Sequence, residues 1–458
     1  MIACLFLFHQ AVASTTQQAY RQILQGNLSP DLNHIATPHR QYLDLMASSL
    51  RYFILEDISS AAIDNLFEQH MDVIESTDPS HPYKLYYEAD SRLRWAAILA
   101  KEGQRLDAAW QVRQAYKAIE RNIELFPDYV PSYKTLGVLQ VALGAVPEKY
   151  QWLISLAGME GSIDGGLKHL DKVVRESQQY GKEALILKSL AYAYILEEPA
   201  TALVLIGELN ESTPIIQLLR LAVRGKASSN GLTLGYRPLQ SDYPLITYLV
   251  AEAHFQAGQY GRASALYNQY LQHHAGNAYK TDSYYKLYLI SYFQGHNSDS
   301  LLTLTHSATA PTTLADKNAI ELSKRPLKTK ELIMLRYAID GGFYERADSV
   351  IGIYSGPTDE QVEFQYRQAR LYQKRDEYPQ AMALYKKVIN TQTDNDYYAP
   401  NSALILGLHY TKLHTRDSAE KYLNMARDYR NHPYETSIEA KAEAALNRIK
   451  DLPDDAHH

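Results

Sequence analysis

Side chains that could bind a metal ion or act as nucleophiles occur in this sequence, but not at the spacings those chemistries require. His273 and His274 are adjacent, and His409 and His414 are five positions apart, so neither pair shares a helix face well. The zinc-protease pattern His-Glu-x-x-His is absent, as is the serine-hydrolase pattern Gly-x-Ser-x-Gly. A lone cysteine, Cys4, cannot form an internal disulfide or a multi-cysteine zinc site. We therefore expect no metal and no cofactor.

Two further patterns could support catalysis, and each has a simpler interpretation. Residues 158–166 read GMEGSIDGG, but they lack the Gly-Lys-Ser/Thr ending of a phosphate loop and follow no predicted strand. We interpret them as a turn that glycine permits at positive φ. Glu197 with Glu198, and Asp454 with Asp455, could serve a glycosidase, which needs two carboxylates about 5–10 Å apart. They stand near helix ends or in the terminal tail, so we interpret them as solvated charges.

Composition excludes several classes of protein. The chain has 458 residues, with 46 basic and 52 acidic side chains and a net charge of −6. Without a basic excess, nucleic acid is not an expected partner. No stretch beyond the N-terminus approaches 18 consecutive apolar residues, so we expect no internal transmembrane span. Tyrosine is unusually frequent, with 37 residues against 9 phenylalanines and 3 tryptophans.

The N-terminus resembles an export signal. Residues 1–13 read MIACLFLFHQAVA, an apolar segment that ends in an Ala-x-Ala cleavage pattern, although no basic residue precedes Arg21. We expect removal of this segment and a periplasmic or outer-membrane-associated location in a bacterium. Two alternatives remain open. Ile2-Ala3-Cys4 resembles the end of a lipobox, which would place a lipid on Cys4, and the segment could also persist as a first helix.

The body of the chain is expected to be helical. Apolar residues recur at spacings of three and four, and prolines fall between the periodic segments or at their starts. One block then repeats at 247–267, 335–351, 369–388 and 407–426. From Ala347 to Ala381 is 34 positions, which is the tetratricopeptide period. The small residues Ala263, Ala381 and Ala419 are predicted to lie where two antiparallel helices cross.

The repeats suggest a division of the chain. The predicted parts are a signal segment at 1–13, an N-terminal helical cap at 18–75, an irregular repeat half at 83–222 with an insert at 145–166, and a regular repeat half at 245–450. Residues 223–244 and 306–330 are predicted as irregular connections, and 451–458 as a frayed tail. In the insert, Tyr150 and Trp152 are expected to pack against neighbouring helices.

The spacings resemble the tetratricopeptide repeat superfamily over most of 83–430. A more specific run resembles an exported bacterial tetratricopeptide family of unassigned activity. Its residues are Pro127, Pro131, Leu136, Gly137, Val146, Pro147, Tyr150, Trp152, Gly158, Gly161 and Gly166. The segment 127–170 is similar, more distantly, to the mitochondrial outer-membrane inclusion-clearance and tetratricopeptide-domain-39 proteins. The resemblance implies an all-α, right-handed solenoid of antiparallel helix pairs, without catalysis.

The superfamily binds ligands with first-helix side chains that point into a concave groove. Carried over to this sequence, those positions are Tyr248, Glu252, Phe255, Leu332, Arg336, Asp340, Tyr366, Arg370, Lys374, Leu408 and Lys412. Four of them, Arg336, Arg370, Lys374 and Lys412, form a basic stripe in an acidic protein, which would suit an acidic peptide or a C-terminal carboxylate. A groove solvated with compensating acids is the alternative.

Two functions follow from this reasoning. The first is a non-enzymatic scaffold that binds a peptide, a protein partner or another copy of itself. The second is a glycan-binding envelope protein that resembles outer-membrane starch-binding lipoproteins. An exposed platform of aromatic rings would favour the glycan, and a charged groove would favour the peptide.

Overall fold

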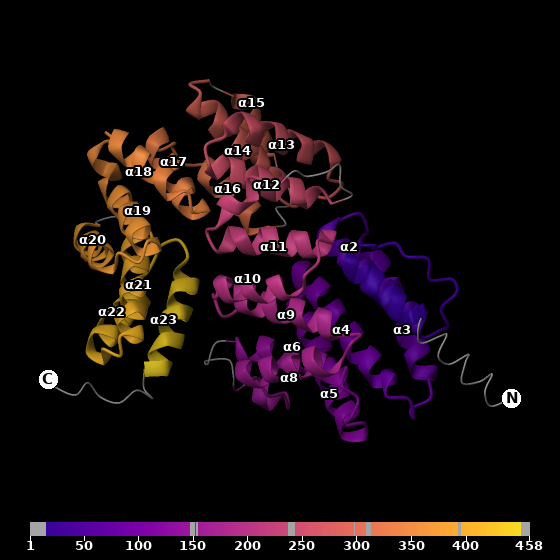
Figure 1. Ribbon diagram of the computed structural model, residues 1–458. Coiled ribbons are helices and arrows are strands. Elements are labelled where there is room, and N and C mark those ends of the chain that lie inside the picture. The colour runs from indigo at the N-terminus through magenta and orange to yellow at the C-terminus, as the bar shows by residue number, and fades with distance from the viewer. Residues whose placement is uncertain are drawn as a thin grey trace. The chain divides into compact units, whose positions relative to one another are not determined.

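The computed structural model describes residues 15–146, 152, 154–236, 243–296, 298–307, 313–392 and 395–449. Their regular structure is helical throughout, and no strand occurs among them (Figure 1). Consecutive helices pack as pairs, for example α4 (Tyr83–Lys101) with α5 (Arg105–Leu125). The predicted fold class, an all-α repeat of helix pairs, is therefore confirmed. The signal segment 1–13, Cys4, Tyr150 and the tail 451–458 lie outside the described residues.

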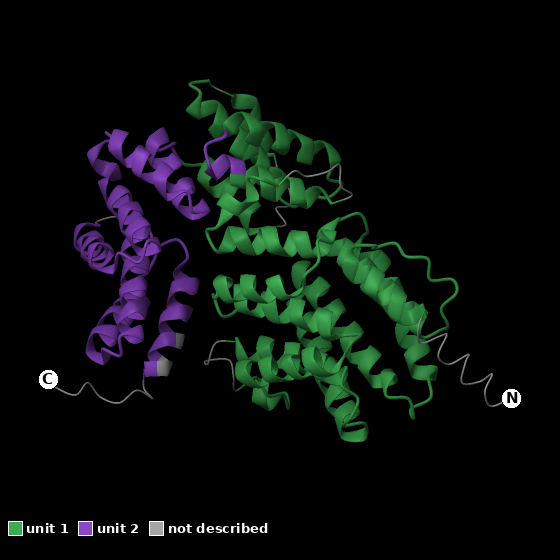
Figure 2. Cartoon of the chain, viewed as in Figure 1, with its two compact units in different colours: residues 1–146, 150–253, 260–325 green, residues 147–149, 254–259, 326–458 purple. Residues whose placement is uncertain are grey.

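The chain forms two compact units (Figure 2). Unit 1 takes in most of the chain as far as Arg325, and unit 2 comprises mainly residues 326–458, together with residues 254–259. The boundary follows Arg325, within the range 306–330 that was predicted as an irregular connection and that contains helix α16 (Leu314–Ser323). Residues 223–244, which were predicted to separate the two repeat halves, lie within unit 1.

Unit 1 contains the larger set of helices. After helical residues 15–25, they are α2 (His39–Ile54), α3 (Ser60–Ser76), α4, α5, α6 (Ser132–Gly144), α8 (Ile163–Glu176), α9 (Gly181–Tyr194), α10 (Pro199–Glu208), α11 (Pro214–Lys226), the 3-10 turn η1 (Asn230–Thr233), most of α12 (Pro244–Gln256), α13 (Tyr260–His273), α14 (Lys280–Phe293), α15 (Asp299–His306) and α16 (Leu314–Ser323).

Local sequence sets several helix starts. The Ser59 and Ser162 hydroxyls accept the backbone N–H groups of Ala62 and Gly165 and thereby cap α3 and α8. Helices α10 and α11 begin with proline, whose missing N–H costs nothing in a first turn. These starts confirm that the prolines mark helix boundaries.

The glycine-rich run has a packing role. A Cβ atom on Gly137 of α6 would lie 2.8 Å from the carbonyl oxygen of Gly166 in α8, and one on Gly161 would lie 2.5 Å from the backbone of Gly144. Glycine therefore lets α6 and α8 approach closely. Within the run only Gly158 has a positive φ, 72°, so the turn interpretation holds at that position and is wrong for the others.

Trp152 of the same insert is 62% exposed. The expectation that it packs against neighbouring helices is therefore wrong. Leu156 is also exposed, whereas Ile154 between them is buried in the hydrophobic cluster of unit 1, so this part of the insert has one buried and one exposed apolar face.

The N-terminal residues belong to the core of unit 1. Tyr20 and Ile23 are fully buried and share one hydrophobic cluster with residues as distant in sequence as Val250. Tyr243 donates a hydrogen bond to the carbonyl oxygen of Gly26, and a carboxylate oxygen of Glu56 accepts the N–H groups of Asn277 and Ala278. Hydrogen bonds between residues more than 200 positions apart in sequence thus hold the N-terminal helices of unit 1 against the segment that contains α12–α14.

Unit 2 is the more regular repeat. Its helices are α17 (Lys330–Gly341), α18 (Tyr344–Ile353), the 3-10 turn η2 (Thr358–Glu360), α19 (Gln361–Lys374), α20 (Tyr378–Thr391), α21 (Tyr398–Lys412), α22 (Arg416–Asp428) and α23 (Glu435–Ile449). Ala381 and Ala419 are fully buried here, as is Ala263 in unit 1. The predicted burial of these three alanines is confirmed.

Replacing Ala381 by leucine is expected to destabilise the protein by about 1–3 kcal/mol, because three heavy atoms enter a packed crossing between α19 and α20. Chemical denaturation monitored by circular dichroism measures the loss. Ala383→Leu is the matched control, since Ala383 is exposed on the same helix. Equal stability of the two variants would contradict the crossing assignment.

Candidate peptide-binding site

Unit 2 brings three arginines together from two first helices of its pairs. Arg336 lies on α17, and Arg367 and Arg370 lie one turn apart on α19. The positive charge of Arg367 acts on both of the others. We call Arg336, Arg367 and Arg370 the arginine cluster. Arginine keeps its charge in proteins, so the cluster carries three positive charges at neutral pH.

Arg367 is held in place by its neighbours. Its Nε and Nη2 atoms donate to Glu363 Oε1 at 3.1 and 2.7 Å, and Nη2 also donates to the Tyr397 hydroxyl at 3.1 Å. The guanidinium lies 5.3 Å from the ring centre of Tyr366 and 5.7 Å from that of Tyr398. Burial would raise the pKa of Glu363, but Arg367 and the Tyr398 hydrogen bond outweigh it and hold that pKa below its usual value.

Arg336 is less fully satisfied. Its side chain is 26% exposed, and its Nε lies 3.8 Å from Asp340 Oδ2, beyond hydrogen-bond distance. That Nε is buried and has no hydrogen-bond partner in the described part of the chain. On α19, Arg370 donates from Nη1 to Gln373 Oε1 at 3.2 Å, and it is half-buried. The cluster thus combines Arg367, whose guanidinium makes three hydrogen bonds, with Arg336, whose Nε–H lacks an acceptor among the described residues.

The charges do not cancel. Asp340 and Glu363 supply two carboxylates against the three guanidiniums, which leaves an excess of one positive charge among tyrosine rings. Arginine presents a planar fork of donors that matches a carboxylate, and low solvent exposure strengthens such a bond. The arrangement can therefore bind a carboxylate.

Of the other predicted positions, Tyr366 contacts the arginine cluster, with its ring beside Arg367. Lys374, near the end of α19, is half-buried, and Lys412 is exposed at the end of α21. The Tyr366 ring is buried, and its hydroxyl accepts a hydrogen bond from Asn401 at 2.6 Å. Phe255 is also buried, and its ring meets Tyr337 edge-on at 4.8 Å. Leu332 is buried on α17, and Leu408 is exposed on α21.

Tyr248 and Glu252 belong to a buried ionic group in unit 1. Tyr248 donates to Asp282 Oδ2 at 2.8 Å, and Lys286 Nζ lies 2.9 Å from both Glu252 Oε1 and Asp282 Oδ2. Burial raises the pKa of Glu252, and the neighbouring Lys286 opposes that shift. These side chains pair with one another across α12 and α14. The structure therefore does not bring Tyr248 and Glu252 together with the arginine cluster.

A second buried ionic group of unit 1, which the sequence analysis did not predict, is balanced. We call Asp90, Arg94, Lys134 and Glu183 the ionic quartet. Arg94 bonds Asp90 at 2.8 Å and Glu183 at 2.6 Å, and Lys134 bonds the same two acids at 3.0 and 2.6 Å. Tyr20 also donates a hydrogen bond to Glu183. Two positive and two negative charges leave no excess for a ligand, in contrast to the arginine cluster.

Unit 1 is expected to lose stability in acid because of the quartet. Burial would raise the pKa of Asp90 and Glu183, but Arg94 and Lys134 outweigh it and hold both pKa values below their usual range. Unfolded carboxyl groups titrate at about 3.9 and 4.3. Their stabilisation is therefore complete above about pH 5 and is lost as the pH falls through the lower folded values. Urea midpoints across this range should fall less steeply in Asp90→Asn than in the exposed control Asp72→Asn, and equal slopes would contradict the prediction.

Among the described residues, no group of three or more His, Cys, Asp or Glu side chains is placed to hold a metal ion. None of the described helices combines the length and apolar character needed to cross a bilayer.

Comparisons with known proteins add little. No protein-family model and no curated protein matches the sequence. Among solved structures, the chain is similar to the crystal structure of yeast Tom70, with 13% identity over 90% of this chain and 97% of that chain. The TM-score is 0.22, so no conclusion about fold or function is drawn from this likeness.

Proposed function

We propose that the protein is a non-enzymatic interaction scaffold, and that unit 2 binds an acidic peptide segment or a C-terminal carboxylate of a protein partner at the arginine cluster. The observation that carries this proposal is the excess of guanidinium over carboxylate on α17 and α19, with the buried Arg336 Nε lacking a hydrogen-bond partner among the described residues.

A buried charge without a compensating partner is costly. A guanidinium donor away from water that lacks a partner costs about 1–3 kcal/mol, and an incoming carboxylate supplies the missing acceptor. Because Glu363 and the tyrosines already fix Arg367, the neighbouring guanidiniums lie against an ordered wall. A pre-ordered site loses less side-chain entropy when a ligand binds.

The proposal is tested with a fluorescein-labelled peptide of alternating Glu and Gly. Fluorescence anisotropy should show binding to the full chain that weakens as salt is added, since screening reduces the attraction between opposite charges. The same peptide with Gln in place of Glu should bind at least about tenfold more weakly, because charge-assisted hydrogen bonds are lost. Equal binding of the two peptides, independent of salt, would contradict an acidic ligand.

The finer assignments stay proposals. Export to a bacterial envelope rests on residues 1–13, and the similarity to an exported bacterial family rests on residues 127–170. Another copy of the chain is an alternative source of the acidic segment, and sedimentation at several protein concentrations separates self-association from binding of a different partner.

A further inference from the structure

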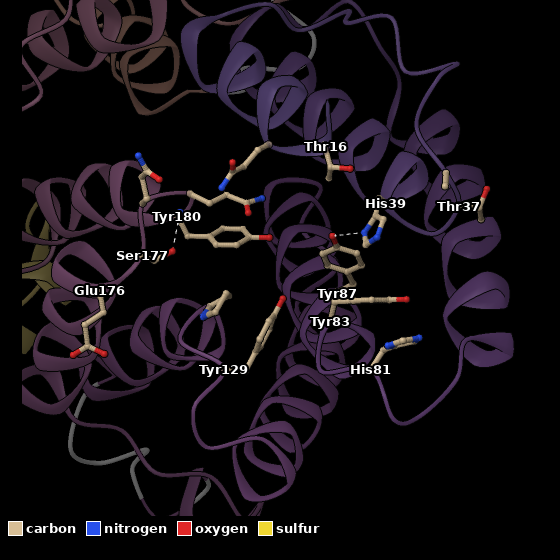
Figure 3. Close-up of a pocket in the computed structure, with 15 residues that line it drawn as sticks. Thr16, Thr37, His39, His81, Tyr83, Tyr87, Tyr129, Glu176, Ser177 and Tyr180 are labelled. Carbon is tan, nitrogen blue, oxygen red and sulfur yellow. Dashed lines mark hydrogen bonds between the residues drawn. The ribbon is translucent and has the colours of Figure 1, made fainter. Parts of the chain in front are cut away.

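A pocket of about 770 Å³ in unit 1 contains none of the predicted site residues (Figure 3). Tyr129 and Tyr180 lie on one wall, and Tyr83, Tyr87 and His39 lie on the other. Volumes of about 300–1,000 Å³ are typical of small-molecule sites.

The rings of this pocket are held by one another. His39 Nδ1 lies 2.8 Å from the Tyr87 hydroxyl, and the His39 ring meets Tyr83 edge-on at 4.8 Å. On the opposite wall, the Tyr180 backbone N–H donates a hydrogen bond to the Ser177 hydroxyl at 3.1 Å. His81 stacks on Tyr83 at 5.0 Å. The aromatic surface is therefore ordered before any ligand arrives.

The lining suits a ligand that has both apolar and polar surface, and it disfavours an anion. Of the described residues that line the pocket, only Ala36 and Pro131 lack a polar side-chain atom, so an apolar ligand would leave many polar groups unpaired. None of them is Lys or Arg, so a strong anion would find no fixed positive side chain.

The pocket offers a cation a single carboxylate, that of Glu176 at the C-terminal end of α8, and the N-terminal ends of other helices oppose it. α2, α4, α6 and α9 all begin at its edge, since residues just before or at their first turns line it. The N-terminal end of a helix carries partial positive charge. The first turns of α2, α4 and α6 contain no acidic residue to offset that charge, and the one acid in the first turn of α9, Glu183, is paired with Arg94 and Lys134.

We infer that the pocket binds a neutral sugar unit. A sugar ring has an apolar face that packs on the tyrosine walls and hydroxyls that both donate and accept hydrogen bonds. The rim supplies matching groups, namely the carboxamides of Gln17, Gln178 and Gln179 and the hydroxyls of Thr16 and Ser177. This site is separate from the arginine cluster and goes beyond the function proposed above.

Saturation-transfer NMR and calorimetry on the full chain test the inference, with glucose, galactose, N-acetylglucosamine and maltose as the probes. At least one probe should bind. Tyr83→Leu should weaken its binding by about threefold to tenfold, because a stacking ring is lost, while Tyr83→Phe should retain it. Gln178→Ala should also weaken binding. Tyr378→Leu, at a partly exposed tyrosine of unit 2, is the matched control.

Three outcomes would overturn the inference. The first is that none of the four sugars binds. The second is that Tyr83→Leu folds and binds the sugar as well as the unmodified chain does. The third is that Tyr83→Leu no longer binds the acidic Glu-Gly peptide. The last would assign the pocket to the peptide. If the arginine-cluster variants bind the peptide normally, the proposed peptide-binding function is contradicted, but the sugar-binding inference is not. The two hypotheses can therefore be rejected separately.

Discussion

Arg336→Glu combined with Arg370→Glu is expected to abolish binding of the acidic Glu-Gly peptide. Removing one partner of a close, desolvated charge pair costs about 2–5 kcal/mol, and reversal adds repulsion between like charges. We therefore expect at least about a hundredfold loss of affinity by fluorescence anisotropy. The half-buried setting of both side chains makes this the largest functional effect we expect from any two substitutions.

Two further variants keep this result interpretable. Arg336→Gln with Arg370→Gln removes the charge without adding an acid, and it should weaken binding less than the reversal does. Arg121→Glu reverses an exposed arginine of unit 1 and should leave binding nearly unchanged. If the reversed protein retains its circular dichroism spectrum and binds the peptide as the unmodified chain does, the arginine cluster is not the binding site.

Lys134→Met is expected to destabilise the protein by about 3–5 kcal/mol. Lys134 is 1% exposed and bonds both acids of the ionic quartet, so its loss leaves Asp90 and Glu183 sharing Arg94 alone. Breaking a buried ionic group by removing one partner carries a penalty of this size, because a charge stays buried without compensation. Urea denaturation followed by circular dichroism gives the difference in unfolding free energy.

The matched control is Lys324→Met. Lys324 pairs with Glu321 at 2.7 Å, but both side chains are more than half exposed, and such pairs contribute at most about 1 kcal/mol. If the unfolding free energies show that Lys134→Met is no more destabilising than Lys324→Met, that result contradicts a stabilising role for the ionic quartet.

Much of the fold is predictable because its determinants are local. The position of a small residue at a helix crossing follows the repeated block: Ala381 lies 34 positions after Ala347 and Ala419 a further 38, so both could be placed from the sequence. Proline and capping residues act within one helix turn, so several helix starts could be expected too. The close approach of Gly137 and Gly166 could not be predicted from the sequence, because it depends on which two helices pack against each other.

The site was only partly predictable. Arg336 and Arg370 occupy groove positions carried over from the repeat frame. Arg367 lies on the same first helix as Arg370 but at none of those positions, so it was not predicted. Its i, i+4 spacing from Glu363 was the available signal. Tyr248 and Glu252 also fit the frame, yet their partners come from α14, and sequence spacing does not reveal which neighbouring helix supplies a counter-charge.

The most direct test of the central claim is to map where an acidic peptide binds. A Glu-Gly peptide with a photoreactive benzoylphenylalanine at its centre is cross-linked to the full chain, and the adducts are located by mass spectrometry. We predict adducts within α17 and α19, which are suppressed by excess unlabelled Glu-Gly peptide and not by the Gln-Gly peptide. Adducts confined to unit 1, or adducts that the Gln-Gly peptide suppresses equally, would contradict the assignment of the arginine cluster as the binding site.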